Sequence, residues 1–224
     1  MSNILRSLDG SILTNALLSI IPALICITFH ELSHGYVAYK LGDNTAKNMG
    51  RLTLNPIKHI DPFGLLMMVV ARFGWAKPVP VNMMNFKNPK RGMAITALAG
   101  PLSNILLAVV ILFIYGILYP FLIQSSGGVT ALELIYITAY LSVALAMFNI
   151  IPIPPLDGSK ILFSFLPSEM YYKLMRYERY GMIILMVIIV TGAFSGYLSV
   201  AVTFIFEKLF YIAEIALNLT TRFL

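Results

Sequence analysis

Two histidines four residues apart flank a glutamate within an apolar stretch of the chain, His30-Glu31-Leu32-Ser33-His34. On a helix, residues at i and i+4 lie on one face about one turn apart, so both imidazoles can bind one metal ion. Glu31 lies beside them, where a carboxylate can take a proton from a metal-activated water. The pattern predicts a catalytic zinc site with His30 and His34 as metal ligands and Glu31 as general base.

The alternative is a polar helix end whose histidines hydrogen-bond to neighbouring helices. An ionisable side chain near the centre of a bilayer costs roughly 2.5–3.5 kcal/mol on insertion scales. Three such groups on adjacent turns need an offsetting partner, and a metal ion is the natural one. We therefore favour the metal site, and we expect Gly35, directly after the second histidine, to allow close approach by another helix.

A third ligand must come from elsewhere, because catalytic zinc commonly has three protein ligands. The candidates are His59, Asp61 and Asp157. Asp157 follows three prolines that end the preceding helix, since proline removes a donor and clashes with the preceding turn. Such a break can turn the carboxylate back toward the histidines, and Gly158 permits a tight turn. We expect Asp157 as the ligand; its alternative role is a helix cap. For His59 and Asp61 we expect local loop hydrogen bonds.

The composition indicates a membrane protein. The apolar fraction is 58% and the charged fraction is 12%, whereas an ordinary soluble domain has about 25% charged residues. We expect an all-α integral membrane protein that forms a single domain, residues 1–224, whose first apolar run is a retained helix and not a removed signal peptide. Four segments are of membrane-spanning length or nearly so: 12–41, 92–123, 131–151 and 181–206. The tail, 207–224, has apolar residues at helical spacing and is expected to lie along the interface.

Basic residues indicate the orientation. The net charge is +6, and the Lys and Arg residues gather in the connection 42–91 and in the one after the third span, while the loop 124–130 carries none. The positive-inside rule places both basic connections in the cytoplasm. Since His34 is six residues from Lys40, about 9 Å of helix, the metal is expected inside the bilayer, toward the cytoplasmic side. Basic residues spread over membrane-flanking loops speak against nucleic-acid binding.

Two pieces of the 42–91 connection stand out. Residues 63–71 are apolar but too few to span as a helix, which suits an interfacial or re-entrant piece. Residues 75–82 are expected to form an extended segment, and the two prolines in it, Pro78 and Pro80, leave one edge without backbone donors. A substrate strand could add to the other edge, and the alternative is a plain interfacial hairpin. The amides of that edge belong to Lys77, Val79 and Val81.

Two asparagines lie on otherwise apolar helices. Either Asn149 or Asn104 could donate to the oxyanion of a tetrahedral intermediate or hold a substrate backbone. For Asn104 the alternative, a hydrogen bond between helices, is the stronger prediction. Gly100, followed by Pro101, predicts close packing and a kink in the second span.

Taken together, these motifs resemble the site-2 protease family of intramembrane zinc metalloproteases. The resemblance rests on the segments His30–His34, Gly74–Asn82, Gly100–Asn104 and Asn149–Gly158, and covers most of residues 25–165. It implies one Zn²⁺ held by His30, His34 and Asp157, Glu31 as general base, and transmembrane proteins as substrates. It also favours Asn149 near the active site, and it implies that residues 75–82 belong to a short re-entrant β-loop. No PDZ or CBS domain is evident, so the chain is similar to minimal members.

These observations predict a zinc metalloendopeptidase that hydrolyses peptide bonds within or near transmembrane segments of membrane proteins, as in regulated intramembrane proteolysis. We expect a multi-pass protein of the cell membrane, with the lipid bilayer and a membrane-protein substrate as partners. The alternatives are a membrane metal carrier or sensor that uses the same ligands, and an inactive, substrate-binding relative. Neither alternative needs the glutamate beside the ligands.

Overall fold

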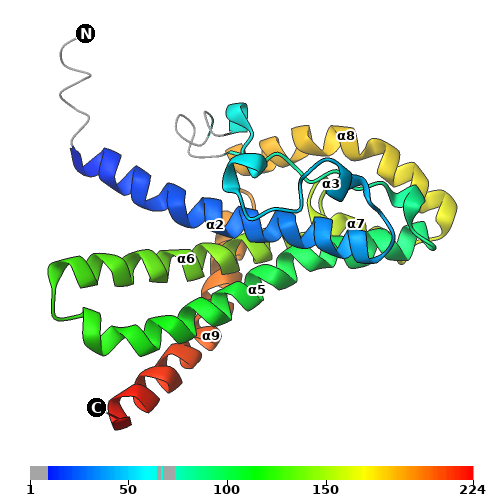
Figure 1. Ribbon diagram of the computed structural model, residues 1–224. Coiled ribbons are helices and arrows are strands. Elements are labelled where there is room, and N and C mark those ends of the chain that lie inside the picture. Colours follow the sequence, from blue (N-terminus) through cyan, green and yellow to red (C-terminus); the bar gives the residue numbers. More distant parts are fainter. Residues whose placement is uncertain (1–9, 65–66, 68–73, 224) are drawn as a thin grey trace.

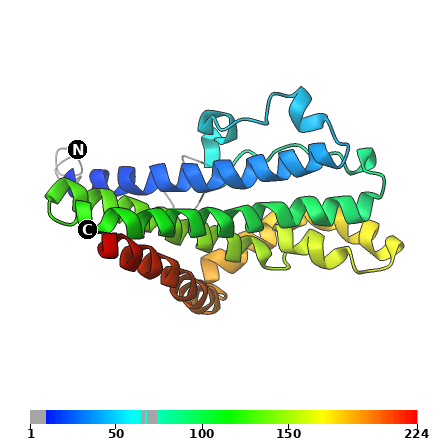
Figure 2. The ribbon, with the colours of Figure 1, turned by 60° about the horizontal axis from the view of Figure 1, so that its bottom comes forward.

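Three long helices lie side by side and form the body of the molecule (Figure 1, Figure 2). The computed structural model describes residues 10–64, 67 and 74–223. The three helices are α2 (Gly10–Lys40), α5 (Pro89–Leu122) and α6 (Ser126–Ile150). Each is long and apolar enough to cross a membrane, α2 over its part Ile20–Lys40. The expected all-α membrane fold is confirmed, and these three spans lie close to their predicted ranges.

Local sequence sets the ends of these helices. The Asn88 side chain accepts the backbone N–H of Arg91, with Pro89 in the first turn, so α5 begins with a strong N-cap. α6 ends at Ile150, directly before the proline-rich stretch, as predicted. The chain then turns into the short helix α7 (Asp157–Phe163).

The fourth span differs from the prediction of one continuous helix over 181–206. The chain forms α8 (Ser168–Thr191) and α9 (Ser195–Phe223), and the apolar part of α8 meets α9 at a bend of 86°. Gly192 ends α8 in the left-handed conformation, with φ +65°, which glycine adopts without steric cost. With this bent pair taken as one span, the described helices give up to four spans.

The described part of the tail 207–224 does not form a helix of its own, and its expected position along the membrane interface stays a prediction. Its described residues continue α9, which packs across α5 and α6 (Figure 1). Small side chains permit this contact: a Cβ added to Gly116 of α5 would lie 2.2 Å from the Ala213 carbonyl oxygen. The core cluster between these three helices consists of Ala108, Leu112, Ala139, Val143, Val202, Phe206 and Ala213.

The connection between α2 and α5 is mostly irregular. It contains α3 (Thr45–Asn48) and the 3₁₀ turns η1 (Pro56–His59) and η2 (Met83–Asn85). The expected β-loop consists of an extended segment with one antiparallel bridge, Ile60 to Ala76, and no named strand occurs in the described part of the chain. The predicted re-entrant piece 63–71 lies mostly outside the described residues.

Candidate metal centre

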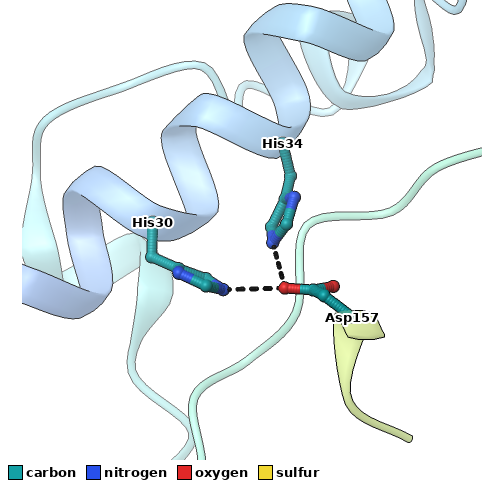
Figure 3. Close-up of side chains that lie close together, drawn as sticks. All are labelled: His30, His34 and Asp157. Atoms are coloured by element: carbon teal, nitrogen blue, oxygen red, sulfur yellow. Dashed lines mark hydrogen bonds and ion pairs between the residues drawn. The ribbon is translucent and has the colours of Figure 1, made fainter. Parts of the chain in front are cut away.

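Three side chains from two distant elements converge in the helix bundle (Figure 3). His30 and His34 project from one face of α2, and Asp157 is the first residue of α7. Both imidazole Nε2 atoms lie 3.1 Å from the same oxygen, Oδ2 of Asp157, and the three candidate ligand atoms lie within 4.8 Å of one another. Two imidazoles and one carboxylate form a donor set that zinc prefers. The buried group therefore fits a metal ion.

Helix α5 fixes the ring of His34. Its Nδ1 lies 2.7 Å from the backbone oxygen of Thr96, and because a carbonyl oxygen only accepts, Nδ1 donates its proton there, which leaves Nε2 of the neutral ring available to a metal ion. Such an outer partner orients a metal-binding histidine. Sequence reasoning missed Thr96, because its contribution is a backbone carbonyl that no motif marks.

Gly100 lets α5 approach both rings. A Cβ built on Gly100 would lie 2.4 Å from His34 Nε2 and 2.7 Å from His30 Cε1. No real side chain tolerates such distances. The predicted close packing at Gly100 is confirmed, and its partner is the histidine pair itself.

His30 differs from His34 in its outer contacts. Its Nδ1 atom is buried and has no hydrogen-bond partner among the described residues. One turn beyond Gly100 on α5, Asn104 is fully buried, and both polar atoms of its amide also lack a partner. Ser142 of α6 donates to the backbone oxygen of Asn104 at 2.8 Å. The interhelical bond expected of the Asn104 side chain is therefore made by its backbone carbonyl.

A lysine lies next to the carboxylate of Asp157. Lys160 Nζ is 4.0 Å from Asp157 Oδ1 and 3.6 Å from Glu178 Oε1 of α8. The i, i+3 spacing from Asp157 was a signal for this contact that the sequence analysis did not use. Gly158 makes the turn possible, as predicted, since its Cβ would lie 1.9 Å from the Ile150 carbonyl oxygen.

The extended segment 77–82 contacts the general-base candidate. The backbone N–H of Val79 donates to Glu31 Oε2 at 2.8 Å, and that of Lys77 donates to the His59 carbonyl at 3.0 Å. The prediction of a free edge is therefore wrong for these two amides, because tertiary contacts already use them. Gly35 allows the close approach of this segment, through Val79, and of the short helix α3, through Ala46.

Asp43, just beyond α2, anchors the far end of the segment. Its carboxylate accepts the backbone N–H of Asn82 at 2.7 Å and also bonds to Asn85 and Thr45. Burial alone would raise the pKa of Asp43, but the hydrogen bonds from Thr45, Asn85 and Asn82 lower it below its ordinary value. Buried Arg51 donates to the Lys77 carbonyl at 2.8 Å. Sequence reasoning missed Asp43 and Arg51 as anchors of the segment. Asp43 in particular gives no signal, since Gly42-Asp43-Asn44 resembles an ordinary turn.

The remaining candidates have local partners. His59 Nε2 lies 2.9 Å from the Thr53 carbonyl oxygen, and Asp61 accepts the N–H of Gly64 at 2.8 Å. The predicted loop hydrogen bonding of His59 and Asp61 is confirmed. The Asn149 amide donates to the Leu145 carbonyl of its own helix, so its role toward substrate stays a prediction, as does that of Val81.

Comparison with known proteins agrees with this donor set. The model of peptidase family M50 matches residues 116–194. YwhC of Bacillus subtilis, named as a zinc metalloprotease, is 43% identical over 176 residues, which cover 77% of this chain and 80% of the relative. Rip2 of Mycolicibacterium smegmatis, similarly named, is 29% identical over 189 residues, or 82% and 71% of the two chains. No solved structure matches the chain significantly.

The chain belongs to peptidase family M50, the site-2 protease family. It is a zinc metalloprotease with an all-α membrane fold.

Proposed function

We propose that His30, His34 and Asp157 hold one Zn²⁺, and that the chain hydrolyses peptide bonds within or near transmembrane segments of membrane proteins. The observation that carries this proposal is the convergence of both Nε2 atoms on one carboxylate oxygen, 3.1 Å from each. This group lies between two helices that can each cross a membrane, α2 and α5.

The residues around the group have complementary tasks. Zn²⁺, when bound, supplies a Lewis acid for the scissile carbonyl and for water. Glu31 is adjacent to the ligand His30 in sequence, and its carboxylate takes the proton from the attacking water and passes it to the leaving amine. His34 keeps its Nε2 lone pair available because the Thr96 carbonyl accepts the Nδ1 proton.

The segment 77–82 is the proposed docking edge for an unwound substrate. A helical peptide bond is internally hydrogen-bonded, so a substrate must become extended before cleavage, and an extended edge can pair with it. Val79 holds Glu31 through one backbone hydrogen bond. Substrate pairing at Val79 therefore releases the carboxylate at the moment when a base is needed. Asn149 and Asn104 are the proposed polar contacts to the substrate or its oxyanion.

We further place the protein in the cell membrane, with the site toward the cytoplasmic side. The support is the charge pattern: α2 and α5 meet the basic connection at Lys40 and Pro89, and the loop between α5 and α6 carries no charge. Helix α7, which contains Asp157 and Lys160, lies at the same end of the bundle as α3 of this connection (Figure 1).

Paired substitutions test the proposal. Glu31→Gln is expected to keep stoichiometric zinc and to abolish cleavage of a tagged single-span membrane protein that the wild type cleaves in co-expression. Asp157→Ala is expected to lose both the zinc and the cleavage. Zinc is measured on purified protein by atomic absorption. Full cleavage by Glu31→Gln would contradict the role assigned to Glu31, whereas a zinc-loaded wild type that cleaves no membrane substrate would favour a metal carrier or sensor.

A further inference from the structure

A basic cleft lies at the end of the bundle where α2 ends and α5 begins. One cavity of about 670 Å³ lies between the first turns of α5 and the α7–α8 connection. A second cavity, of about 430 Å³, adjoins it toward the end of α2 and shares Lys87, Asn88, Arg91 and Ile95. Together these two cavities, which we call the rim cleft, are lined by four basic residues: Lys40, Lys87, Lys90 and Arg91.

The charge of the rim cleft is unbalanced. Among the described lining residues there is no carboxylate, while the hydroxyls of Ser164 and Ser168 provide neutral hydrogen-bonding groups. Lys90 donates to the Leu166 carbonyl, which joins the two walls. Lys87 and Arg91 are exposed, so their charged groups can reach a ligand. An anion with several oxygen acceptors fits this lining.

Apolar surface continues from the cleft in one direction. Ile95 lines both cavities and is 40% exposed, and it is followed on the same face of α5 by Leu98 and Leu102, 45% and 53% exposed. Phe165 and Tyr172, on the opposite wall, are also exposed. Tyrosine side chains such as that of Tyr172 are typical of the level of lipid headgroups. A free phosphate ion has no apolar part that could contact this face, whereas a phospholipid has acyl chains.

We propose that the rim cleft binds the headgroup of an anionic phospholipid, with its acyl chains along Ile95, Leu98 and Leu102. Basic pockets between membrane helices bind such headgroups, and the attraction is set by the number of Lys and Arg residues near the surface. A lipid bound there contacts two elements that lead to the metal centre. One is the start of α5, the helix that carries Thr96 and Gly100, and the other is the α7–α8 connection, which follows Asp157 in the chain. The site is separate from the metal ligands and does not depend on the proposed proteolytic role.

Calorimetric titration of the purified, zinc-loaded protein in neutral detergent tests the proposal. The probes are dihexanoyl phosphatidylglycerol, dihexanoyl phosphatidylcholine and inorganic phosphate, at equal ionic strength. We expect saturable binding of the phosphatidylglycerol only. The double variant Lys87→Gln/Arg91→Gln should weaken it about thirtyfold, or about fivefold for each charge. The control, Lys58→Gln/Arg176→Gln, removes two exposed charges outside the cleft and should leave binding unchanged.

Three results would overturn the lipid site. These are equal binding of phosphatidylcholine, equal binding of inorganic phosphate, and equal loss in the cleft and control variants. Zinc content and the melting temperature without lipid verify that the variants fold. If the double variant is unstable, each single variant must show its fivefold loss, and an unchanged affinity in both singles would equally refute the proposal. Failure here leaves the zinc test of Asp157→Ala unaffected.

Discussion

On one side of the candidate site, α5 packs directly against the histidine rings, while on the other side the segment 77–82 is held by individual hydrogen bonds. The helix side offers a backbone carbonyl, that of Thr96, and a glycine, Gly100, in contact with both rings. The segment side depends on side chains that reach its backbone: Glu31 to Val79, Asp43 to Asn82 and Arg51 to Lys77. The two sides meet neighbouring residues of α2: α5 contacts His30 and His34, and the segment contacts Glu31.

The two kinds of contact suit two different requirements, a fixed metal geometry and an exchangeable substrate-binding edge. Metal geometry tolerates displacements of only a few tenths of an ångström, and close packing of helices provides that precision. A substrate-binding edge must instead exchange partners, and hydrogen bonds from side chains can be replaced one for one by those of an incoming strand. The helix side should therefore control zinc, and the segment side should control access and the general base.

The largest expected effect is on the helix side. Gly100→Ala places a methyl group in contact with His34 Nε2, so the rings or the helix must shift. Overpacking of this kind costs about 1–3 kcal/mol, and we expect zinc affinity to fall at least tenfold and cleavage to be lost. The control is Gly127→Ala, where an added Cβ meets nothing within 4 Å. An unchanged zinc affinity of Gly100→Ala, measured by competition with a chelator, would show that the ligand geometry does not depend on this contact.

A second effect concerns His30. The ring of His34 contacts Thr96 and Gly100, and that of His30 contacts Gly100, so the next turn of α5 lies beside His30. Asn104 occupies that turn. Buried polar groups rarely lack partners. We infer that the side-chain amide oxygen of Asn104, Oδ1, accepts the Nδ1 proton of His30 when the metal is bound.

Asn104→Leu should then weaken zinc binding about ten- to a hundredfold, measured by competition with a chelator, as expected for an outer partner of a metal ligand. Asn104→Asp keeps an acceptor and should restore tight binding. Ser142→Ala removes the α5–α6 hydrogen bond to the same residue and serves as control. Equal zinc affinities in Asn104→Leu and the wild type would leave Asn104 with a packing role alone.

The convergence of the three candidate ligands was more predictable from the sequence than their surroundings. His30 and His34 share a face by helical period alone, and the prolines before Asp157 mark the break that turns its carboxylate inward. The bend at Gly192 was not predictable, because a lone glycine in an apolar run is tolerated inside a helix. The bond between Glu31 and Val79 joins residues 48 apart in sequence, and such tertiary partners leave no periodic signal.

On the segment side, Asp43→Asn should produce a smaller effect of a different kind. Hydrogen bonds to a charged group contribute about 1.5–3 kcal/mol, so the amides near Asn82 should exchange hydrogen roughly ten- to a hundredfold faster, measured by mass spectrometry of peptic fragments. Zinc content should stay stoichiometric, in contrast with Gly100→Ala. Loss of zinc in Asp43→Asn would show that the segment side also controls zinc binding, which contradicts the division of roles between the two sides.

The smallest effect is a dependence of the segment on pH. The pKa of Asp43 is lower in the folded protein than its ordinary value of 3.8, so the ionised carboxylate stabilises the folded segment. This contribution is complete above about pH 4 and is lost as the pH falls through the lowered pKa. Between about pH 5 and pH 3, amide exchange near Asn82, corrected for its intrinsic pH dependence, should accelerate in the wild type. Asp43→Asn lacks the titrating group, so its exchange should change less. The same pH response in both proteins would show that Asp43 is not the group whose titration loosens the segment.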